Sequence, residues 1–239
     1  YESGSMQNWT NGYGLGNTKP LADSARRSES VINLAKIEKI ENVLDFGCGE
    51  GFMLSEFAKI FSAYGFEPEK RSRELCISSG FKVFSDFTQL QENSFKFDLI
   101  TLFHVIEHLY NPSDLLIELK NYLRPGGLIV TETPNSMDAL LTFFKSEPFQ
   151  NFTYWSHHPM LYSSVALRHL VTLSEYEVLE NKFIQRYGLA NHLYWLSKGK
   201  PGGHEIWGKE FGAQVNREYE NVLIDKGISD TLWLVAKNS

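Results

Sequence analysis

Residues 43–51 read Val-Leu-Asp-Phe-Gly-Cys-Gly-Glu-Gly, and this stretch decides the fold. The apolar residues before the glycines predict a short buried strand, and a helix is predicted to begin at Phe52. A glycine-rich loop between a strand and a helix lets backbone N–H groups approach a ligand closely at the helix N-terminus. This loop is therefore the first candidate for a binding site.

The spacing of the glycines separates this loop from a dinucleotide-binding loop. The dinucleotide pattern G-x-G-x-x-G requires a glycine at position 52, where the sequence has phenylalanine. Gly47, Gly49 and Gly51 instead form the pattern G-x-G-x-G. The carboxylate of Asp45 would repel a pyrophosphate and would favour a ligand that carries an ammonium group.

Strands and helices alternate along the sequence around this loop, and the strands are nearly continuous apolar runs. This pattern predicts an α/β fold with a Rossmann-like, mostly parallel sheet and helices on both faces. Ligands bind to such sheets at the carboxyl ends of the strands. Strands are predicted at residues 42–46, 62–66, 81–84, 97–103, 128–132, 176–183 and 231–236. Helices are predicted at residues 52–60, 68–79, 112–123 and 163–174, with an N-terminal helix that runs from a cap at Asp23 or Ser24 to about Lys39.

Charge and composition narrow the class of partner. The chain has 239 residues and a formal net charge of −6 at pH 7, whereas nucleic-acid binders use Lys and Arg to displace counterions. No apolar run approaches the roughly 20 residues of a membrane span, and no signal peptide is recognisable. Cys48 and Cys76 lie far apart, so they give no disulfide framework and no metal-ligand spacing. We therefore expect a cytoplasmic protein with a small-molecule partner and with neither a nucleic-acid nor a membrane partner.

Several motifs in combination resemble the class I S-adenosylmethionine-dependent methyltransferases. Residues 45–51, Asp-Phe-Gly-Cys-Gly-Glu-Gly, resemble motif I of this family, and Glu67 ends the next predicted strand. The match continues with Val-Ile-Glu-His at residues 105–108 and with Leu-Arg-Pro-Gly-Gly at residues 123–127. The resemblance covers roughly residues 40–187. The most similar subgroup is the small-molecule methyltransferases that share the V-I-E-H signature, such as ubiquinone-pathway enzymes and those of bacterial surface-sugar clusters.

The resemblance implies S-adenosyl-L-methionine as the cofactor and S-adenosyl-L-homocysteine as the product. The backbone of the glycine loop would line the methionine part, and Asp45 would face its ammonium group. Glu67 lies about twenty residues after the loop, where a carboxylate can accept hydrogen bonds from both ribose hydroxyls. The expected cofactor site consists of Asp45, Gly47, Cys48, Gly49, Gly51, Glu67, Pro68, Asp86 and Phe87 beside the adenine, and Phe103 and His104 beside the sulfonium. Two simpler interpretations stay open, in which Cys48 is only a small loop residue and Asp86 only caps a turn.

A histidine is the expected general base. An alcohol acceptor must lose a proton, and the ordinary histidine pKa near 6.5 suits that task, whereas a phosphate, carboxylate or neutral amine acceptor needs no strong base. In the resembling family a histidine between the fifth strand and the next helix reaches the acceptor pocket. We therefore expect His158 to be catalytic, with His157 as the second candidate. The alternative is a loop histidine with a structural hydrogen bond.

Three side chains, His104, Glu107 and His108, would share one face of a helical turn. This spacing is similar to that of a metal-ligand set, but the Glu-His pair is mostly structural in the resembling family, so we expect no bound metal. Arg26 and Arg27 are expected on a solvated helix face, with an anionic acceptor as the alternative. Aromatic residues at helical spacing are usually core residues. Some could instead form an acceptor pocket, and the candidates are Tyr154, Trp155, Asn191, His192, Tyr194 and Trp195.

The chain is expected to have distinct parts around the Rossmann-like core. Residues 1–20 would form an N-terminal arm, in which the residues before Met6 resemble a vector remnant and Trp9, Tyr13 and Gly16 suit a lid over the cofactor. Residues 21–187 would form the cofactor-binding core, with an aromatic-rich segment at 136–162 as the lid over the acceptor. Residues 188–227 would form a helical insertion, and residues 228–239 the final strand of the core.

The sequence thus predicts a methyltransferase that acts on a small polar molecule, with O-methylation of a bacterial sugar or capsule-type precursor favoured. Alternative hypotheses are an N-methyltransferase acting on an amino sugar, a metal-assisted quinone-pathway O-methyltransferase and a cofactor-binding subunit without catalysis. A nucleic-acid methyltransferase is a further alternative. The oligomeric state stays open, and a homodimer is compatible with the sequence.

Overall fold

The computed structural model describes residues 19–92, 94–154 and 158–238. Within them a seven-stranded sheet has the order β3-β2-β1-β4-β5-β7-β6, in which only β7 runs antiparallel to its neighbours. The mostly parallel, Rossmann-like sheet is therefore confirmed. Its strands are β1 (Asn42–Phe46), β2 (Ser62–Phe66), β3 (Lys82–Phe84), β4 (Phe97–Phe103), β5 (Leu123–Pro134), β6 (Tyr176–Ile184) and β7 (Thr231–Asn238).

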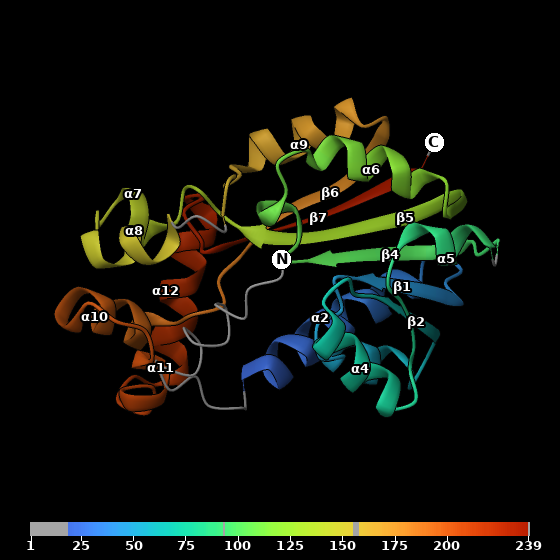
Figure 1. Ribbon diagram of the computed structural model, residues 1–239. Coiled ribbons are helices and arrows are strands. Elements are labelled where there is room, and N and C mark those ends of the chain that lie inside the picture. Colours follow the sequence, from blue (N-terminus) through green and yellow to red (C-terminus); the bar gives the residue numbers. More distant parts are fainter. Residues whose placement is uncertain (1–18, 93, 155–157, 239) are drawn as a thin grey trace.

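Helices cover both faces of this sheet (Figure 1). Successive side chains of a strand point to opposite faces, so Val43 shares a core cluster with Val31 and Phe57, while Leu44 belongs to a second cluster that includes Leu116 and Leu167. Every residue of β4 is buried because this central strand is covered from both sides. The covering helices are α2 (Lys19–Ala35), α3 (Phe52–Phe57), α4 (Lys70–Ser78), α5 (Phe87–Glu92), α6 (Pro112–Lys120) and α9 (Ser164–Leu173).

Several predicted boundaries are wrong. Helix α2 begins at Lys19, before the predicted cap at Asp23 or Ser24, and it ends at Ala35. Helix α4 begins later than predicted because the Glu69 carboxylate caps it by accepting hydrogen bonds from the backbone N–H groups of residues 71 and 72. Residues 123–127, predicted as a helix end and a loop, belong to β5, where Leu123 pairs with Phe97 of β4.

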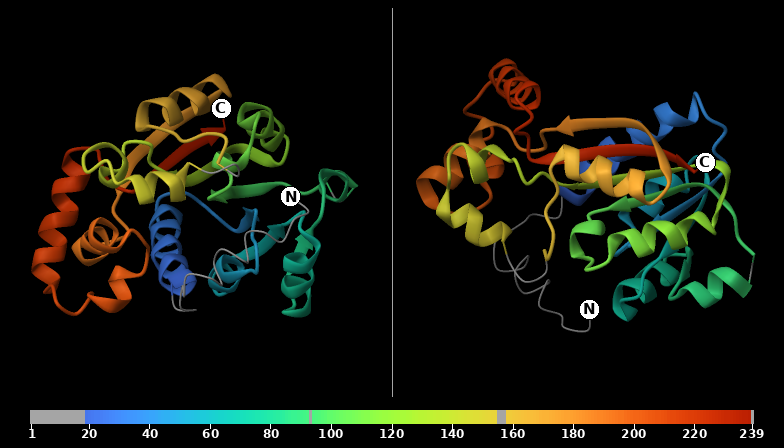
Figure 2. Two further views of the ribbon diagram at one scale, coloured as in Figure 1. Left: turned by 60° about the vertical axis from the view of Figure 1, so that its left-hand side comes forward. Right: turned by 90° about the horizontal axis from the view of Figure 1, so that it is seen from above.

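A second group of helices lies beyond the ends toward which the arrows of β4 and β5 point (Figure 1). The two further views show the same group at one end of the molecule (Figure 2). These are the carboxyl ends of the parallel strands, where ligands bind in such folds. The helices of this group, called the accessory helices below, are α7 (Ala139–Thr142), α8 (Glu147–Thr153), α10 (Leu189–Lys198), α11 (Gly203–Ile206) and α12 (Ala213–Asp225).

Part of the predicted architecture lies outside the described residues. This applies to residues 1–18 of the expected N-terminal arm, with its aromatic lid residues, and to Trp155 and His157. In the part of the chain that the structure describes, no helix is both long and apolar enough to cross a bilayer.

Candidate functional site

The glycine loop after β1 has a backbone conformation that requires glycine. Gly47, Gly49 and Gly51 have φ angles of 77°, 53° and 85°, in the left-handed region that side chains disfavour. A Cβ atom at Gly47 would lie 2.7 Å from Cγ2 of Val105, and one at Gly51 would lie 2.9 Å from Sγ of Cys76. At Gly47 and Gly51 the loop therefore approaches its neighbours too closely for a larger residue.

A cavity of about 260 Å³ lies beside this loop at the carboxyl ends of β1 and β4. We call it the first cavity. Helix α2 contributes to its wall, as do loop residues that follow β1. Of the residues that the sequence predicts for a cofactor site, the first cavity is lined by Asp45, Gly47, Cys48, Gly49, Phe103 and His104.

Asp45 lines the first cavity together with two other acidic residues, Asp23 and Glu50. It is 3% exposed, and it accepts a hydrogen bond of 2.7 Å from Oγ1 of Thr101 on the neighbouring strand. Burial raises its pKa to about 7, although the Thr101 hydrogen bond and the charge of Arg27 act in the opposite direction. A carboxyl with this pKa is ready to ionise when an ammonium group approaches, because a nearby positive charge favours its charged form.

Glu67 lies at the end of β2 and contacts the glycine loop without lining the first cavity. Its carboxylate accepts hydrogen bonds from the backbone N–H groups of Gly49, at 2.9 Å, and Glu69, at 2.8 Å. Burial raises its pKa, and these two hydrogen bonds oppose that shift. Glu67 therefore fixes the position of the loop, and a carboxylate has further lone pairs for other donors.

The other residues predicted for the cofactor site also lie outside the lining of the first cavity. Asp86 is exposed and accepts hydrogen bonds from Oγ of Ser85 and the backbone N–H of Gln89, so it acts as a cap for α5. The ring of Phe87 packs against those of Phe46 and Phe66 in the core. The residues in this group are Gly51, Pro68, Asp86 and Phe87.

The carboxylate of Glu132, which the sequence analysis did not identify, is buried near the end of β5. The Glu132 side chain is 0% exposed and forms ion pairs of 2.7 Å with both Arg26 and Arg27. The expectation that these arginines lie on a solvated face is therefore wrong. Burial alone would raise the pKa of Glu132, but the neighbouring His104 ring and the charges of Arg27 and Arg186 hold it well below its ordinary value. The signal in the sequence was an acidic residue inside an otherwise apolar strand, since acidic side chains are almost never buried unpaired.

Arg186, which follows β6, completes this network. It forms an ion pair with Asp23 of α2, and its Nη1 atom lies 2.9 Å from Nε2 of His104. Because a guanidinium can only donate, Nε2 of His104 accepts, and Nδ1 of the same ring donates to the buried Glu107 at 2.9 Å. Both ring nitrogens of His104 are therefore engaged, so this side chain has a positioning role.

A second cavity, of about 310 Å³, lies between the strand ends and the accessory helices. Its wall includes three aromatic rings, those of Phe149, Phe152 and Trp195, in mutual contact. His104 and Arg186 line both cavities, so the two cavities adjoin at these side chains. The candidate pocket residues Asn191, His192 and Trp195 also line the second cavity, whereas Tyr194 packs against Trp207.

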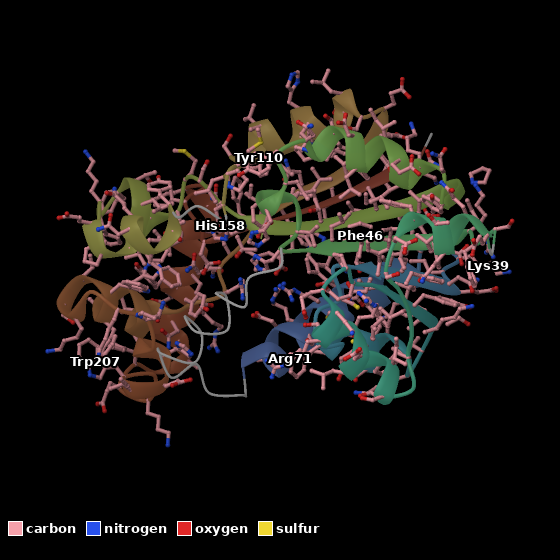
Figure 3. The ribbon with its side chains drawn as sticks, in the orientation of Figure 1. Lys39, Phe46, Arg71, Tyr110, His158 and Trp207 are labelled. Atoms are coloured by element: carbon pink, nitrogen blue, oxygen red, sulfur yellow. The ribbon has the colours of Figure 1, made fainter. Side chains whose placement is uncertain are left out.

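His158 lines the second cavity, and Figure 3 shows it between the accessory helices and the strand ends. Its Nδ1 atom lies 3.0 Å from the carbonyl oxygen of Thr153. A carbonyl can only accept, so Nδ1 carries the proton and Nε2 carries the lone pair. Burial lowers the pKa of His158, which keeps the ring neutral near pH 7. The side chain thus makes the structural hydrogen bond of the alternative interpretation and also retains a basic nitrogen.

The spacing of His104, Glu107 and His108 does not produce a ligand set. Glu107 is buried in the short 3₁₀ helix η1 (Ile106–His108) and accepts hydrogen bonds from His104 and from Oγ1 of Thr133. Burial would raise the pKa of Glu107, but the His104 hydrogen bond and the neighbouring histidines lower it. Among the described residues, no three His, Cys, Asp or Glu side chains are grouped so that they could hold a metal ion.

Comparisons with known proteins identify relatives of the chain. Residues 22–181 match the family model described as "Methyltransferase domain". The tRNA U34 carboxymethyltransferase of Pseudoalteromonas atlantica is 33% identical over 117 residues, which cover 41% of this chain and 33% of the relative. The ubiquinone biosynthesis O-methyltransferase of Pasteurella multocida is 30% identical over 113 residues, which cover 40% of this chain and 47% of the relative. The chain thus spans less than half the length of these two curated relatives.

Solved structures share the fold over most of the chain. The plantazolicin methyltransferase BpumL in complex with SAH superposes with a TM-score of 0.62 and 16% identity, covering 100% of this chain and 92% of that one. A SAM dependent methyltransferase from Archaeoglobus fulgidus superposes with a TM-score of 0.57 and 19% identity, covering 88% and 94% of the two chains. At these identities the likeness concerns the fold.

Proposed function

The chain belongs to the class I S-adenosylmethionine-dependent methyltransferases, and from this premise we propose that it transfers a methyl group to a hydroxyl of a small polar acceptor. A bacterial sugar or capsule-type precursor is the proposed acceptor. The observation that carries the proposal is the pair of adjoining cavities with His104 and Arg186 in both walls. One cavity is formed by the glycine loop of the family, and the other is formed by side chains outside it.

The first cavity suits S-adenosylmethionine. Asp45 would face the ammonium group, and the backbone of Gly47, Cys48 and Gly49 would line the methionine part, as the family motif implies. The left-handed glycines support this fit, since a Cβ at Gly47 would collide with Val105. Glu67 contacts the loop at Gly49, and its carboxylate would accept hydrogen bonds from the ribose hydroxyls. When bound, the cofactor supplies a methyl group already activated by its sulfonium.

The second cavity suits the acceptor. The aromatic rings of Phe149, Phe152 and Trp195 offer apolar surface to a sugar ring or a similar ring. His158 would accept the hydroxyl proton through Nε2, because its Nδ1–H is held by the Thr153 carbonyl. Methyl transfer depends mainly on the alignment of acceptor and methyl group and on the exclusion of water. The accessory helices would supply both by enclosing the acceptor at the strand ends.

Charge and thiol chemistry support the remaining parts of the proposal. The net charge of −6 gives no general attraction to a polyanion, which favours a small acceptor over a nucleic acid. Salt-dependent binding of tRNA by the purified protein would contradict this choice. We also propose a cytoplasmic location, which the free thiols of Cys48 and Cys76 support.

The experiment that tests the proposal measures S-adenosylhomocysteine release from S-adenosylmethionine with a panel of hexoses, amino sugars and phenols. For an active acceptor, His158→Ala should lower kcat by roughly 10²- to 10⁴-fold while the affinity for S-adenosylhomocysteine stays unchanged. His169→Ala on α9, outside both cavities, is the matched control and should keep the wild-type kcat. A wild-type kcat in His158→Ala would contradict the role of His158 and would favour an acceptor that needs no base.

A further inference from the structure

The second cavity is lined by more negative than positive formal charge. Glu107, Asp138 and Asp230 contribute carboxyl groups, and Arg186 contributes the cation. Arg186 is already paired with Asp23 of α2. An anionic acceptor would therefore meet repulsion in this cavity, and a cationic acceptor would meet attraction.

Two of the histidines in the cavity wall add no positive charge near pH 7. Burial lowers the pKa of His192 to about 4 and also lowers the pKa of His158. The other two histidines of the wall are His104, which contacts Arg186 and Glu107, and His108.

The three carboxyl groups differ in what they already bind. Glu107 accepts from His104 and Thr133. Asp230 accepts from the backbone N–H groups of Arg186 and Tyr187 and from the side chain of Gln185, so it orders the segment that follows β6.

Asp138 caps α7 with one carboxyl oxygen, which accepts from the Leu140 N–H at 2.6 Å, and the residue is 4% exposed. Its carboxyl has a second oxygen with lone pairs for a donor in the cavity.

An independent feature of the same cavity also favours a cation. The Trp195 ring contacts that of Phe149 at 5.0 Å between centroids, and that of Phe152 at 5.3 Å. Clustered aromatic rings attract ammonium groups through their π-electron faces. The cavity thus combines aromatic surface with carboxyl groups, and this combination recognises organic amines.

We infer that the acceptor carries an amine, as an amino sugar does, and that Asp138 and Asp230 select its ammonium group while a hydroxyl of the same molecule is presented to His158. This inference rests on the proposed function, because it specifies the acceptor of the same site. It assigns Asp138 and Asp230 to specificity. The position of the methyl group in the product, on oxygen or on nitrogen, tests the proposed function. It does not test the amine inference, because both products require the amine to be bound.

Binding of an ammonium group should release a proton from Asp138. Burial and the neighbouring Asp230 raise the Asp138 pKa to about 8, so this carboxyl is mostly protonated at pH 7. The other titratable groups of its surroundings are Tyr219 of α12, whose pKa is raised to about 12 by burial and by Asp138, and the neutral His192 bonded to Tyr219. Neither changes its charge near pH 7, so Asp138 is the expected source of the proton, and removal of its carboxyl tests this.

The first test compares three probes on the protein saturated with S-adenosylhomocysteine. Glucosamine, glucose and glucuronate share a hexose ring and carry a positive, a neutral and a negative group. Calorimetric titration should give the tightest binding for glucosamine, at least ten-fold tighter than for glucose, with no binding of glucuronate. Equal binding of all three, no binding of glucosamine, or preference for glucose or glucuronate would overturn the inference.

The second test uses Asp138→Asn, which keeps the size of the side chain and the ability to cap α7. The Kd for glucosamine should rise at least ten-fold, and the proton release, measured in buffers of different ionisation enthalpy, should disappear. Asp114→Asn on α6 removes the same charge from an exposed position and should leave both quantities unchanged. An unchanged Kd for glucosamine in Asp138→Asn would refute the assignment.

The two proposals fail in different ways. Lack of S-adenosylhomocysteine binding by the wild type would overturn the proposed function. Normal S-adenosylhomocysteine binding with no preference for glucosamine would overturn only the amine inference. If Asp138→Asn does not fold, proton release by the wild type on glucosamine binding decides the question, and its absence counts against Asp138.

Discussion

At the scale of single residues, Glu132 joins α2 to the sheet. Its carboxylate lies at the end of β5 with no exposed surface, and Arg26 and Arg27 reach it from α2. A buried ion pair contributes little net stability, but the removal of one partner leaves an uncompensated charge. The three side chains therefore act as one unit in which each charge depends on the others.

Glu132→Gln should lower the free energy of unfolding by about 3 kcal/mol, because Arg26 and Arg27 lose the charge that balances them. Urea denaturation at pH 7 measures this quantity. Glu41→Gln breaks an exposed pair with Lys39 and should change the free energy of unfolding by less than about 1 kcal/mol. A Glu132→Gln protein as stable as the Glu41→Gln protein would refute the role of the network.

Asp45 should make cofactor affinity depend on pH. Its pKa is raised to about 7, so the carboxyl is mostly neutral below that pH and ionised above it. The affinity for S-adenosylhomocysteine should therefore rise as the pH increases from 5.5 toward 7.5 and then level off. The same raised pKa means that folding stability decreases as the pH rises from about 4, the unfolded value, through about 7. Calorimetric titrations of the wild type and of Asp45→Asn check this prediction, since the variant should bind more weakly and lose the pH dependence.

At the scale of elements, the glycine loop between β1 and α3 should respond differently to substitution at its different positions. Gly49 and Gly51 both have positive φ angles, but a Cβ at Gly49 would meet nothing within 4 Å, whereas one at Gly51 would lie 2.9 Å from the Cys76 sulfur. The two positions therefore separate backbone strain from steric collision.

Gly49→Ala should lower the free energy of unfolding by about 1 kcal/mol, the cost of a left-handed conformation in an L-residue, and Gly51→Ala by clearly more. Thermal and urea denaturation of both variants measure the difference. Cys76→Ala in the Gly51→Ala background should recover part of the additional loss, because it removes the colliding sulfur. Equal losses for the two single variants would contradict the collision.

Elements with an unbroken apolar run could be predicted from the sequence, and elements that depend on tertiary contacts could not. The bounds of β1, β2 and β4 were predicted correctly because each is a short, largely apolar run beside a turn signal. The start of β5 was missed because Pro125, Gly126 and Gly127 suggest a loop, whereas the strand pairs with β4 on either side of them, at Leu123 and at Leu128. Short helices such as α7 have too few residues for a periodic pattern, so their stability comes from packing.

The candidate site was predictable to the same extent. Residues of the glycine loop are adjacent in sequence to β1, and three of them, Gly47, Cys48 and Gly49, line the first cavity. Their role in cofactor binding stays a prediction. Arg186 and Glu132 meet α2 across more than one hundred residues, and no local pattern encodes such contacts. Phe87 packs on Phe46 and Phe66, and its place beside the adenine stays a prediction.

At the scale of the whole molecule, α2 links the N-terminal part of the described chain to both cavities. Asp23, Ser24 and Arg27 of this helix line the first cavity, and Asp23 also pairs with Arg186. A ligand in the first cavity should therefore stabilise α2 together with the glycine loop, since it would bind only when both are folded in place.

Hydrogen exchange with and without S-adenosylhomocysteine tests this coupling. Amides of α2 and of residues 47–53 should exchange more slowly when the ligand is bound. Helix α9, which packs on the opposite face of the sheet, should show no change and serves as the internal control. Protection of the glycine loop without protection of α2 would show that the helix does not respond to the ligand.

The antiparallel strand β7 lies between β5 and β6 and is synthesised after every other strand of the described sheet. Until residues 231–238 are synthesised, the outer edge of β5 and the whole of β6 have no hydrogen-bonding neighbour in the described sheet. Roughly one hundred residues separate the end of β5 from β7, and at 5–20 residues per second their translation takes roughly 5 to 20 s. The nascent chain therefore exposes two unpaired, partly apolar strand edges for that time, which makes it a substrate for chaperones that bind extended segments.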